Sequence, residues 1–134
     1  MNEHDYLNEL LRCLSCIQRH NGLVSDLLGL LAKSGQESKF LSALLTALRI
    51  LCADGADAVY VRPGQFEKLS YEKDLYSMHV NTKQVNCRIL YTFSSDKPVL
   101  LYGFFEKQGH RKTDYSSATK VARSRMKEWR AKYE

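Results

Sequence analysis

The spacing of apolar residues changes after Gly55, and this change constrains the fold more than any other feature of the sequence. Before Gly55, apolar residues recur every three or four positions, as they do on one face of a helix. Residues 85–93 instead alternate, with apolar side chains at the odd positions and Asn86, Arg88 and Thr92 among the even ones. Such alternation predicts a β-strand in a sheet that has one covered and one open face.

Three helices are predicted before this change, over residues 6–20, 25–33 and 36–53. The first and third are followed by Asn21-Gly22 and Asp54-Gly55, pairs that tolerate the left-handed backbone and end helices often. The third helix carries the widest apolar face, which is wide enough to lie on a sheet.

Four strands and a last helix are predicted after Gly55. The strands cover residues 58–61, 75–80, 85–93 and 99–105, and the helix covers residues 114–133. Short loops between the strands favour antiparallel pairing. The chain is therefore expected to be an α+β domain, with N-terminal helices packed on an antiparallel β-sheet and a C-terminal helix after it.

Charge is distributed unevenly along the 134 residues. Residues 1–60 hold five Lys/Arg and seven Asp/Glu, a net charge of −2, whereas residues 61–134 hold fifteen and eight, a net charge of +7. A basic C-terminal half favours a polyanionic partner, either a nucleic acid or an acidic protein. No apolar run reaches the roughly 18 residues of a membrane helix, and the N-terminus lacks a secretory pattern. We therefore expect a cytoplasmic protein without a membrane partner.

The four cysteines allow two interpretations. Cys13 and Cys16 form a C-x-x-C pair, which can serve redox chemistry or half of a zinc site. The pair lies in a helical pattern and no second pair follows, while Cys52 and Cys87 are distant. We expect all four to be small apolar residues, because a structural zinc site needs about four clustered ligands. No metal or cofactor is expected.

Two stretches of sequence, taken together, resemble a known family. The first comprises Phe66-Glu67-Lys68-Leu69 and Asp74-Leu75-Tyr76-Ser77-Met78-His79. The second comprises Arg88-Ile89-Leu90-Tyr91 and Val99-Leu100-Leu101-Tyr102-Gly103-Phe104-Phe105-Glu106-Lys107, followed by Lys112-Thr113 and a helix with Ala118 and Arg123. In order and spacing they resemble the phage-derived branch of the RelE/HigB toxin superfamily, over residues 40–130. The resemblance divides the chain into an N-terminal helical extension, residues 1–35, and a toxin domain, residues 36–134.

The resemblance implies the toxin of a type II toxin–antitoxin system. Such a toxin is a metal-independent endoribonuclease, a hydrolase that cleaves messenger RNA, commonly on the ribosome. Its partners are messenger RNA, the ribosome and a cognate antitoxin, which we expect to be a helix-turn-helix protein. Cleavage requires a base for the ribose 2′-hydroxyl, cations for the phosphate and an acid for the departing 5′-oxygen.

Five residues are candidates for this chemistry: Arg88, Lys107, His79, His110 and Tyr115. Arg88 lies on the polar side of a strand, where its planar guanidinium can grip a phosphate or form a surface ion pair. Lys107 follows the last strand, as a phosphate ligand or a solvated charge. His79 is expected to face the same cleft, and His110 can act as base or acid or be an inactive loop residue. Tyr115 opens the last helix, where it can stack on a base, assist proton transfer or simply pack.

Candidate RNA-binding residues are basic and lie in or near the last helix. They are Arg111, Lys112, Lys120, Arg123 and Lys127. The same surface could receive an acidic segment of the antitoxin instead of RNA.

Two other functions stay open. The family often has arginine where this chain has His79, histidine where it has Tyr102, and lysine where it has Glu106. These departures are typical of a non-catalytic binding module that has kept the fold. A DNA-binding regulator that uses helix 114–132 ranks lowest, because no helix-turn-helix precedes that helix.

Overall fold

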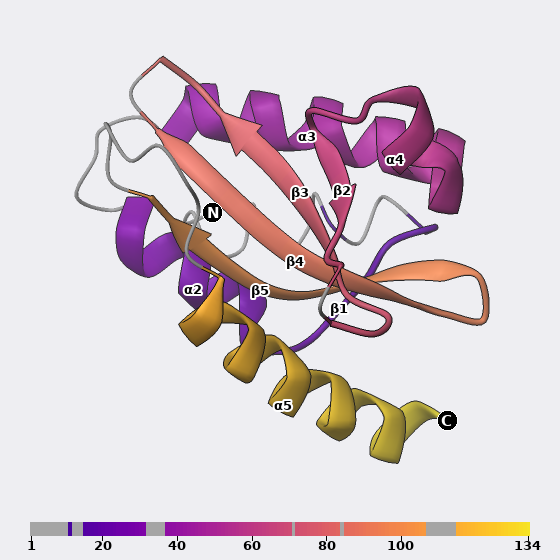
Figure 1. The fold of residues 1–134 in the computed structure, drawn as a ribbon. Helices are drawn as coiled ribbons and strands as arrows, with labels where there is room; N and C mark the ends of the chain where they lie inside the picture. The colour runs from indigo at the N-terminus through magenta and orange to yellow at the C-terminus, as the bar shows by residue number, and fades with distance from the viewer. Residues whose placement is uncertain (1–10, 12–14, 32–36, 71, 84, 107–114) are drawn as a thin grey trace.

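The computed structural model describes residues 11, 15–31, 37–70, 72–83, 85–106 and 115–134. In these residues the chain forms one five-stranded sheet with helices on both faces (Figure 1). The helices are α2 (Leu23–Leu31), α3 (Glu37–Asp54), α4 (Ala58–Val61) and α5 (Ser116–Tyr133). The strands are β1 (Gln18–Arg19), β2 (Phe66–Lys68), β3 (Tyr76–Asn81), β4 (Asn86–Ser94) and β5 (Lys97–Phe105). The predicted α+β class is confirmed.

The sheet is mixed, whereas an antiparallel sheet was expected. Its strand order is β1-β5-β4-β3-β2, and β2 to β5 pair in antiparallel fashion. β1 pairs with β5 in parallel, with Gln18 opposite Val99 and Arg19 opposite Leu100. The helix predicted over residues 6–20 is therefore wrong over its last part, because residues 18–19 hydrogen-bond to β5. A strand thus precedes α2 and α3, which were expected to follow only another helix.

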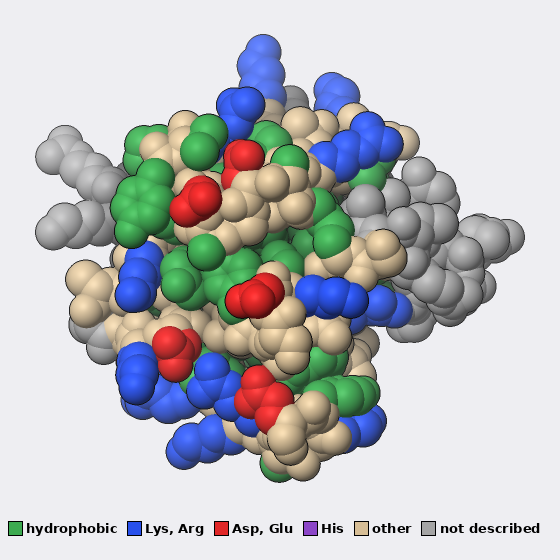
Figure 2. Space-filling model, turned by 90° about the vertical axis from the view of Figure 1, so that its right-hand side faces the viewer, with side chains coloured by type: hydrophobic (Ala, Val, Ile, Leu, Met, Phe, Trp, Pro, Cys, Tyr) green, Lys and Arg blue, Asp and Glu red, His purple; other side chains and the backbone are tan. Residues whose placement is uncertain are grey.

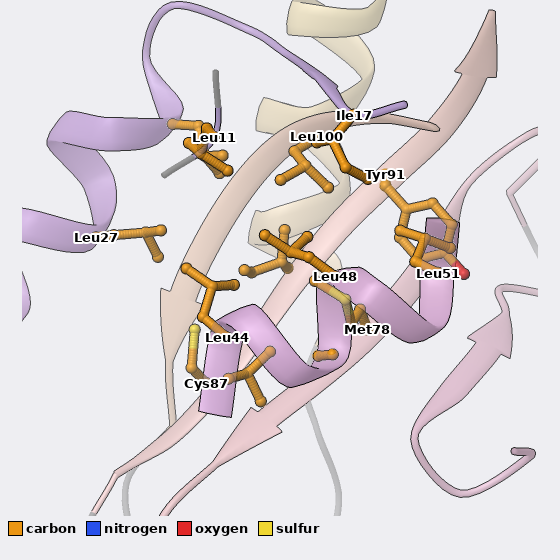
Figure 3. Close-up of a cluster of buried hydrophobic side chains, with 14 of the residues drawn as sticks. Leu11, Ile17, Leu27, Leu44, Leu48, Leu51, Met78, Cys87, Tyr91 and Leu100 are labelled. Atoms are coloured by element: carbon orange, nitrogen blue, oxygen red, sulfur yellow. The ribbon is translucent and has the colours of Figure 1, made fainter. Parts of the chain in front are cut away.

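α3 covers one face of the sheet. Leu44, Leu48 and Leu51 recur every three or four residues along α3 and are fully buried. They point toward Met78 and Tyr91 on the central strands (Figure 3). Two leucines of α2, Leu23 and Leu27, are also buried in this core. The segment assigned to an extension therefore supplies a strand and core residues, while the division at residue 35 stays a prediction.

α5 covers the opposite face. Its buried residues Ala122, Met126 and Trp129 pack on Leu90 of β4 and Leu101 of β5. The even positions of β4 were expected to form an open face, and this expectation is wrong beneath α5. The face turns polar beyond Leu90, toward the first turn of α5, and this end holds the candidate site.

The local sequence explains two turns of the chain and one element that was predicted wrongly. Ser95 and Asp96 both have positive φ, 50° and 64°, so they form the type I′ turn that suits a two-residue hairpin. Gly55 has φ 56° directly after α3, as expected for a residue that ends a helix. Residues 58–61 were predicted as a strand because they are apolar and β-branched in part, but they form α4, which continues from the turn after α3.

Cys16 and Cys52 are joined by a disulfide, with their Cα atoms 5.8 Å apart. The bond ties the segment before β1 to α3, so the interpretation of both cysteines as simple apolar residues is wrong. The separation of 36 residues concealed their proximity. Cys87 is free and buried, as expected, and burial raises the pKa of its thiol. Cys13 lies outside the described residues.

Candidate functional site

A cluster of polar side chains surrounds Arg88 on the face of the sheet that carries α5. In the antiparallel register Arg88 lies opposite His79 on β3 and Phe104 on β5. Cys87 and Ile89, its neighbours along β4, point to the other face, into the core under α3. Strand alternation therefore places the guanidinium of Arg88 on the same face as His79, as the sequence predicted.

Two carboxylates hold Arg88. Its Nε donates a hydrogen bond to Glu106 Oε1 at 3.0 Å, and its Nη1 lies 3.6 Å from Glu67 Oε1. The Arg88 side chain is 17% exposed and that of Glu106 10%, whereas the Glu67 side chain is 48% exposed. The buried contact to Glu106 fixes the plane of the guanidinium, and the longer, exposed contact to Glu67 is the one that solvent or a ligand can replace.

Tyr115 adds a hydroxyl to the cluster from the residue just before α5. Its hydroxyl donates to Glu67 Oε1 at 2.5 Å and lies 3.1 Å from Ser77 Oγ. Burial and the hydrogen bond to Glu67 raise the pKa of Tyr115 to about 12. Tyr115 is therefore a neutral hydrogen-bond donor at physiological pH.

His79 joins the cluster through Asn86. Its Nε2 hydrogen-bonds to Asn86 Oδ1, and Asn86 Nδ2 donates to Glu106 Oε2 at 3.4 Å. Because Glu106 also binds Arg88, one chain of hydrogen bonds joins the imidazole to the guanidinium. This chain of hydrogen bonds holds the His79 imidazole beside Arg88 and engages its Nε2.

The structure brings together three of the five predicted catalytic residues, Arg88, His79 and Tyr115. The other two, Lys107 and His110, lie outside the described residues, as do Arg111 and Lys112. A hollow shared by Arg88 and Lys107 therefore stays a prediction.

Sequence reasoning missed three members of the cluster: Glu67, Ser77 and Glu106. Glu67 stood within the family-like stretch but had no role there, and Glu106 counted only as a departure from the family. Their signal is positional, because Glu67 and Ser77 pair with each other across β2 and β3. That register is not readable from either strand alone.

The outer side of α5 is basic. Lys120, Arg123 and Lys127 are exposed and recur at intervals of three and four residues, so they share one side of the helix. Arg123 is paired with Glu72. Lys and Arg side chains predominate in the lower part of the face in Figure 2, at the level of α5 in Figure 1, with Asp and Glu among them.

Two other basic residues of α5 have structural partners. Arg125 Nη1 donates to the Leu101 carbonyl at 3.0 Å, and its Nη2 donates to Asp26 Oδ1 at 3.1 Å. Arg130 pairs with Asp74 and Glu134. Arg125 thus joins α5 to α2 and is not available to a polyanion.

Two further expectations concern histidine and tyrosine. His20 was expected at the surface, but its side chain is only 11% exposed and hydrogen-bonds to Glu128 at 2.8 Å. Tyr102 packs under α5 beside Phe104, with ring centroids 5.9 Å apart, as its position in the strand predicted.

Comparisons with known proteins do not name a family. The chain matches no protein-family model and no curated protein sequence. In the described part of the chain, no group of three His, Cys, Asp or Glu side chains is placed to hold a metal ion. No described helix combines the length and the apolar content that crossing a membrane requires.

Proposed function

We propose that this chain is an RNA-cleaving toxin of the RelE/HigB type, with its active site at Arg88. The observation that carries the proposal is the meeting of Arg88 and Tyr115 at Glu67, at the polar end of the sheet. Glu67 Oε1 lies 3.6 Å from Arg88 Nη1 and accepts a hydrogen bond from the Tyr115 hydroxyl at 2.5 Å. A cation, a carboxylate and a neutral hydroxyl are the groups that cleavage by a ribose 2′-hydroxyl needs.

Each group has a role in the proposed reaction. An RNA phosphate replaces Glu67 at the Nη atoms of Arg88, while Glu106 keeps the guanidinium in place through Nε. The displaced Glu67 carboxylate accepts the proton of the 2′-hydroxyl, whose oxygen attacks the phosphorus atom. Tyr115, which is protonated at neutral pH, donates to the developing negative charge or to the departing 5′-oxygen. The products are a 2′,3′-cyclic phosphate and a 5′-hydroxyl.

The basic side of α5 supports an RNA partner. Lys120, Arg123 and Lys127 lie on the outer side of α5, and Tyr115 of the cluster directly precedes this helix. Such a row can follow a phosphate backbone. An antitoxin that covers this side with acidic residues would block the cluster as well, which is how we propose that a cognate partner silences the chain.

One observation favours a second function, a binding module of the same fold without catalysis. Arg88 is already held by two carboxylates, and the more buried one, Glu106, stands where the family often has lysine. In this alternative the chain binds RNA or a protein along α5 and cleaves nothing.

The test is induced expression together with cleavage of RNA by the purified protein in EDTA. Growth arrest and fragments with 2′,3′-cyclic phosphate ends are expected for the wild type. Arg88→Ala should reduce the cleavage rate by about 10²-fold or more, because it removes a donor to the developing charge. Lys107→Ala should also relieve arrest.

Controls separate chemistry from folding. Glu67→Gln changes a half-exposed side chain and should preserve the thermal midpoint while it lowers the rate by about 10²-fold. Lys97→Ala, at an exposed position of β5, should retain full activity. RNA binding without arrest or cleavage in the wild type would refute the nuclease and favour the binding module.

A further inference from the structure

A pocket of about 120 Å³ lies far along α5 from Arg88. Arg19, His20 and Asn21 line one side, at the end of β1 and the start of the next turn. The last two turns of α5 line the other side with Glu128, Trp129, Lys132 and Tyr133. Neither the resemblance nor the proposed active site gives this pocket a role.

One wall of the pocket is held in place by hydrogen bonds. The Gly22 backbone N–H donates to His20 Nδ1 at 3.0 Å, so the hydrogen of the neutral ring is on Nε2. That Nε2 donates to Glu128 Oε2 at 2.8 Å. The bond joins the turn after β1 to α5 and presents a carboxylate at the pocket.

The other wall is aromatic. Trp129 and Tyr133 have ring centroids 4.1 Å apart, and Lys132 Nζ lies 5.3 Å from the centroid of the Tyr133 ring. Tyr133 is 57% exposed, whereas Trp129 is buried beside it. The indole nitrogen of Trp129 has no hydrogen-bond partner in the described part of the chain. A buried donor of this kind is rare in a native protein without a ligand or water.

We propose that this pocket binds one nucleotide of single-stranded RNA. Aromatic rings beside mixed donors and acceptors, here Asn21 and Glu128, are the usual means of holding an unstacked base. A closed cavity of about 150 Å³ holds a benzene molecule, and this pocket is smaller, about 120 Å³, but open to solvent, so it can take the edge of one base and not a whole nucleotide. The base enters the pocket, and the phosphate stays outside it.

The charges around the pocket favour the orientation in which the base is inside and the phosphate outside. The C-terminal end of α5 carries partial negative charge and Glu128 carries a full one, so a neutral base is favoured inside over a phosphate. Lys132 supplies the positive charge for the phosphate. Glu128 and Asn21 read the edge of the base.

The pocket extends the proposed active site along the RNA, and in that respect the inference rests on the proposed function. Tyr115 precedes α5 at the Arg88 cluster, and Trp129 follows 14 residues later. At 1.5 Å per residue these two positions are roughly 21 Å apart along the helix axis. One strand of RNA that occupies both the cluster and the pocket therefore spans about this distance along α5.

The chain has a single tryptophan, Trp129, so its fluorescence reports directly on this pocket. The probes are the four ribonucleoside 5′-monophosphates, with ribose 5-phosphate and inorganic phosphate as probes that lack a base. At least one mononucleotide should change the emission in a saturable way at concentrations where the probes without a base do not. Lys132→Ala should weaken this nucleotide about 10-fold, as expected for loss of one charged contact.

A matched control is Lys39→Ala, which removes an exposed charge near the start of α3, outside the pocket and the proposed RNA-binding residues, and should leave the affinity unchanged. No saturable change with any mononucleotide, or equal changes with ribose 5-phosphate, would overturn the inference. Equal affinity in wild type and Lys132→Ala would do the same. Saturable nucleotide binding without RNA cleavage would refute only the nuclease, whereas cleavage without nucleotide binding would refute only the pocket.

Discussion

Reduction of the Cys16–Cys52 disulfide should destabilise the fold strongly. The bond closes a loop of 36 residues, and such a loop loses roughly 13 cal/mol/K of denatured-state entropy. At 25 °C this corresponds to about 4 kcal/mol in the free energy of unfolding. Both cysteines are partly buried against the core under α3, so loss of their contacts would add to the entropic effect.

Urea unfolding with and without dithiothreitol measures this difference. With a slope of about 1.5 kcal/mol per molar, the midpoint should fall by about 2.5 M urea on reduction. Cys16→Ser and Cys52→Ser should each unfold like the reduced wild type, with or without dithiothreitol. Cys13→Ser keeps both bonded cysteines and should retain the full response to the reductant.

Equal midpoints for the oxidised and reduced wild type would refute the reasoning. The same bond bears on the expected cytoplasmic location, because disulfides persist mainly in oxidising compartments. Thiol alkylation of the protein directly in lysed cells, followed by mass spectrometry, should find Cys16 and Cys52 protected if the bond forms there. Alkylation of both would place the protein in a reducing compartment.

Two further predictions concern packing and pH. Gly103→Ala should lower the free energy of unfolding in urea by about 1–3 kcal/mol, because the added Cβ would lie 2.6 Å from Cδ2 of the fully buried Leu27. Gly64→Ala should lower it by less than about 0.5 kcal/mol, because nothing lies within 4 Å of the added Cβ. Equal losses in the two variants would contradict the close contact at Gly103. Above pH 10 the unfolded chain releases the Tyr115 proton while the folded chain keeps it up to about pH 12, so the free energy of unfolding should fall across this range. Urea midpoints at pH 9 and 11 should show a smaller fall for Tyr115→Phe than for the wild type, and an identical fall would count against the raised pKa.

The elements that local pattern determines were predicted from the sequence. β3, β4, β5 and α5 each lie within about two residues of the predicted bounds, because alternation, helical spacing and turn residues are local signals. β1 was missed for the opposite reason. Two residues carry no period, and only their pairing with a strand about 80 positions later makes them part of the sheet.

The candidate site was predicted in part. Arg88 and His79 could be placed on one face because strand alternation gives the side on which each residue points. Glu67 and Glu106 could not be placed beside Arg88 from the sequence, because their approach to it depends on the pairing of β2 with β3 and of β4 with β5. The contact between Arg125 and Asp26 of α2 could not be predicted either, because the sequence of a basic helix does not show which of its charged residues meets a partner on another helix.

The parallel pairing of β1 with β5 has a consequence for the order of assembly during translation. β1 is synthesised near the start of the chain, but the strand that it pairs with in the described part of the chain begins at Lys97. Until the ribosome has released that stretch, Leu23 and Leu27 have no β5 to pack against, and the early part of the nascent chain carries uncovered apolar side chains. Contacts between segments that are far apart in the sequence form slowly, so we expect a chaperone to bind the nascent chain at this early segment.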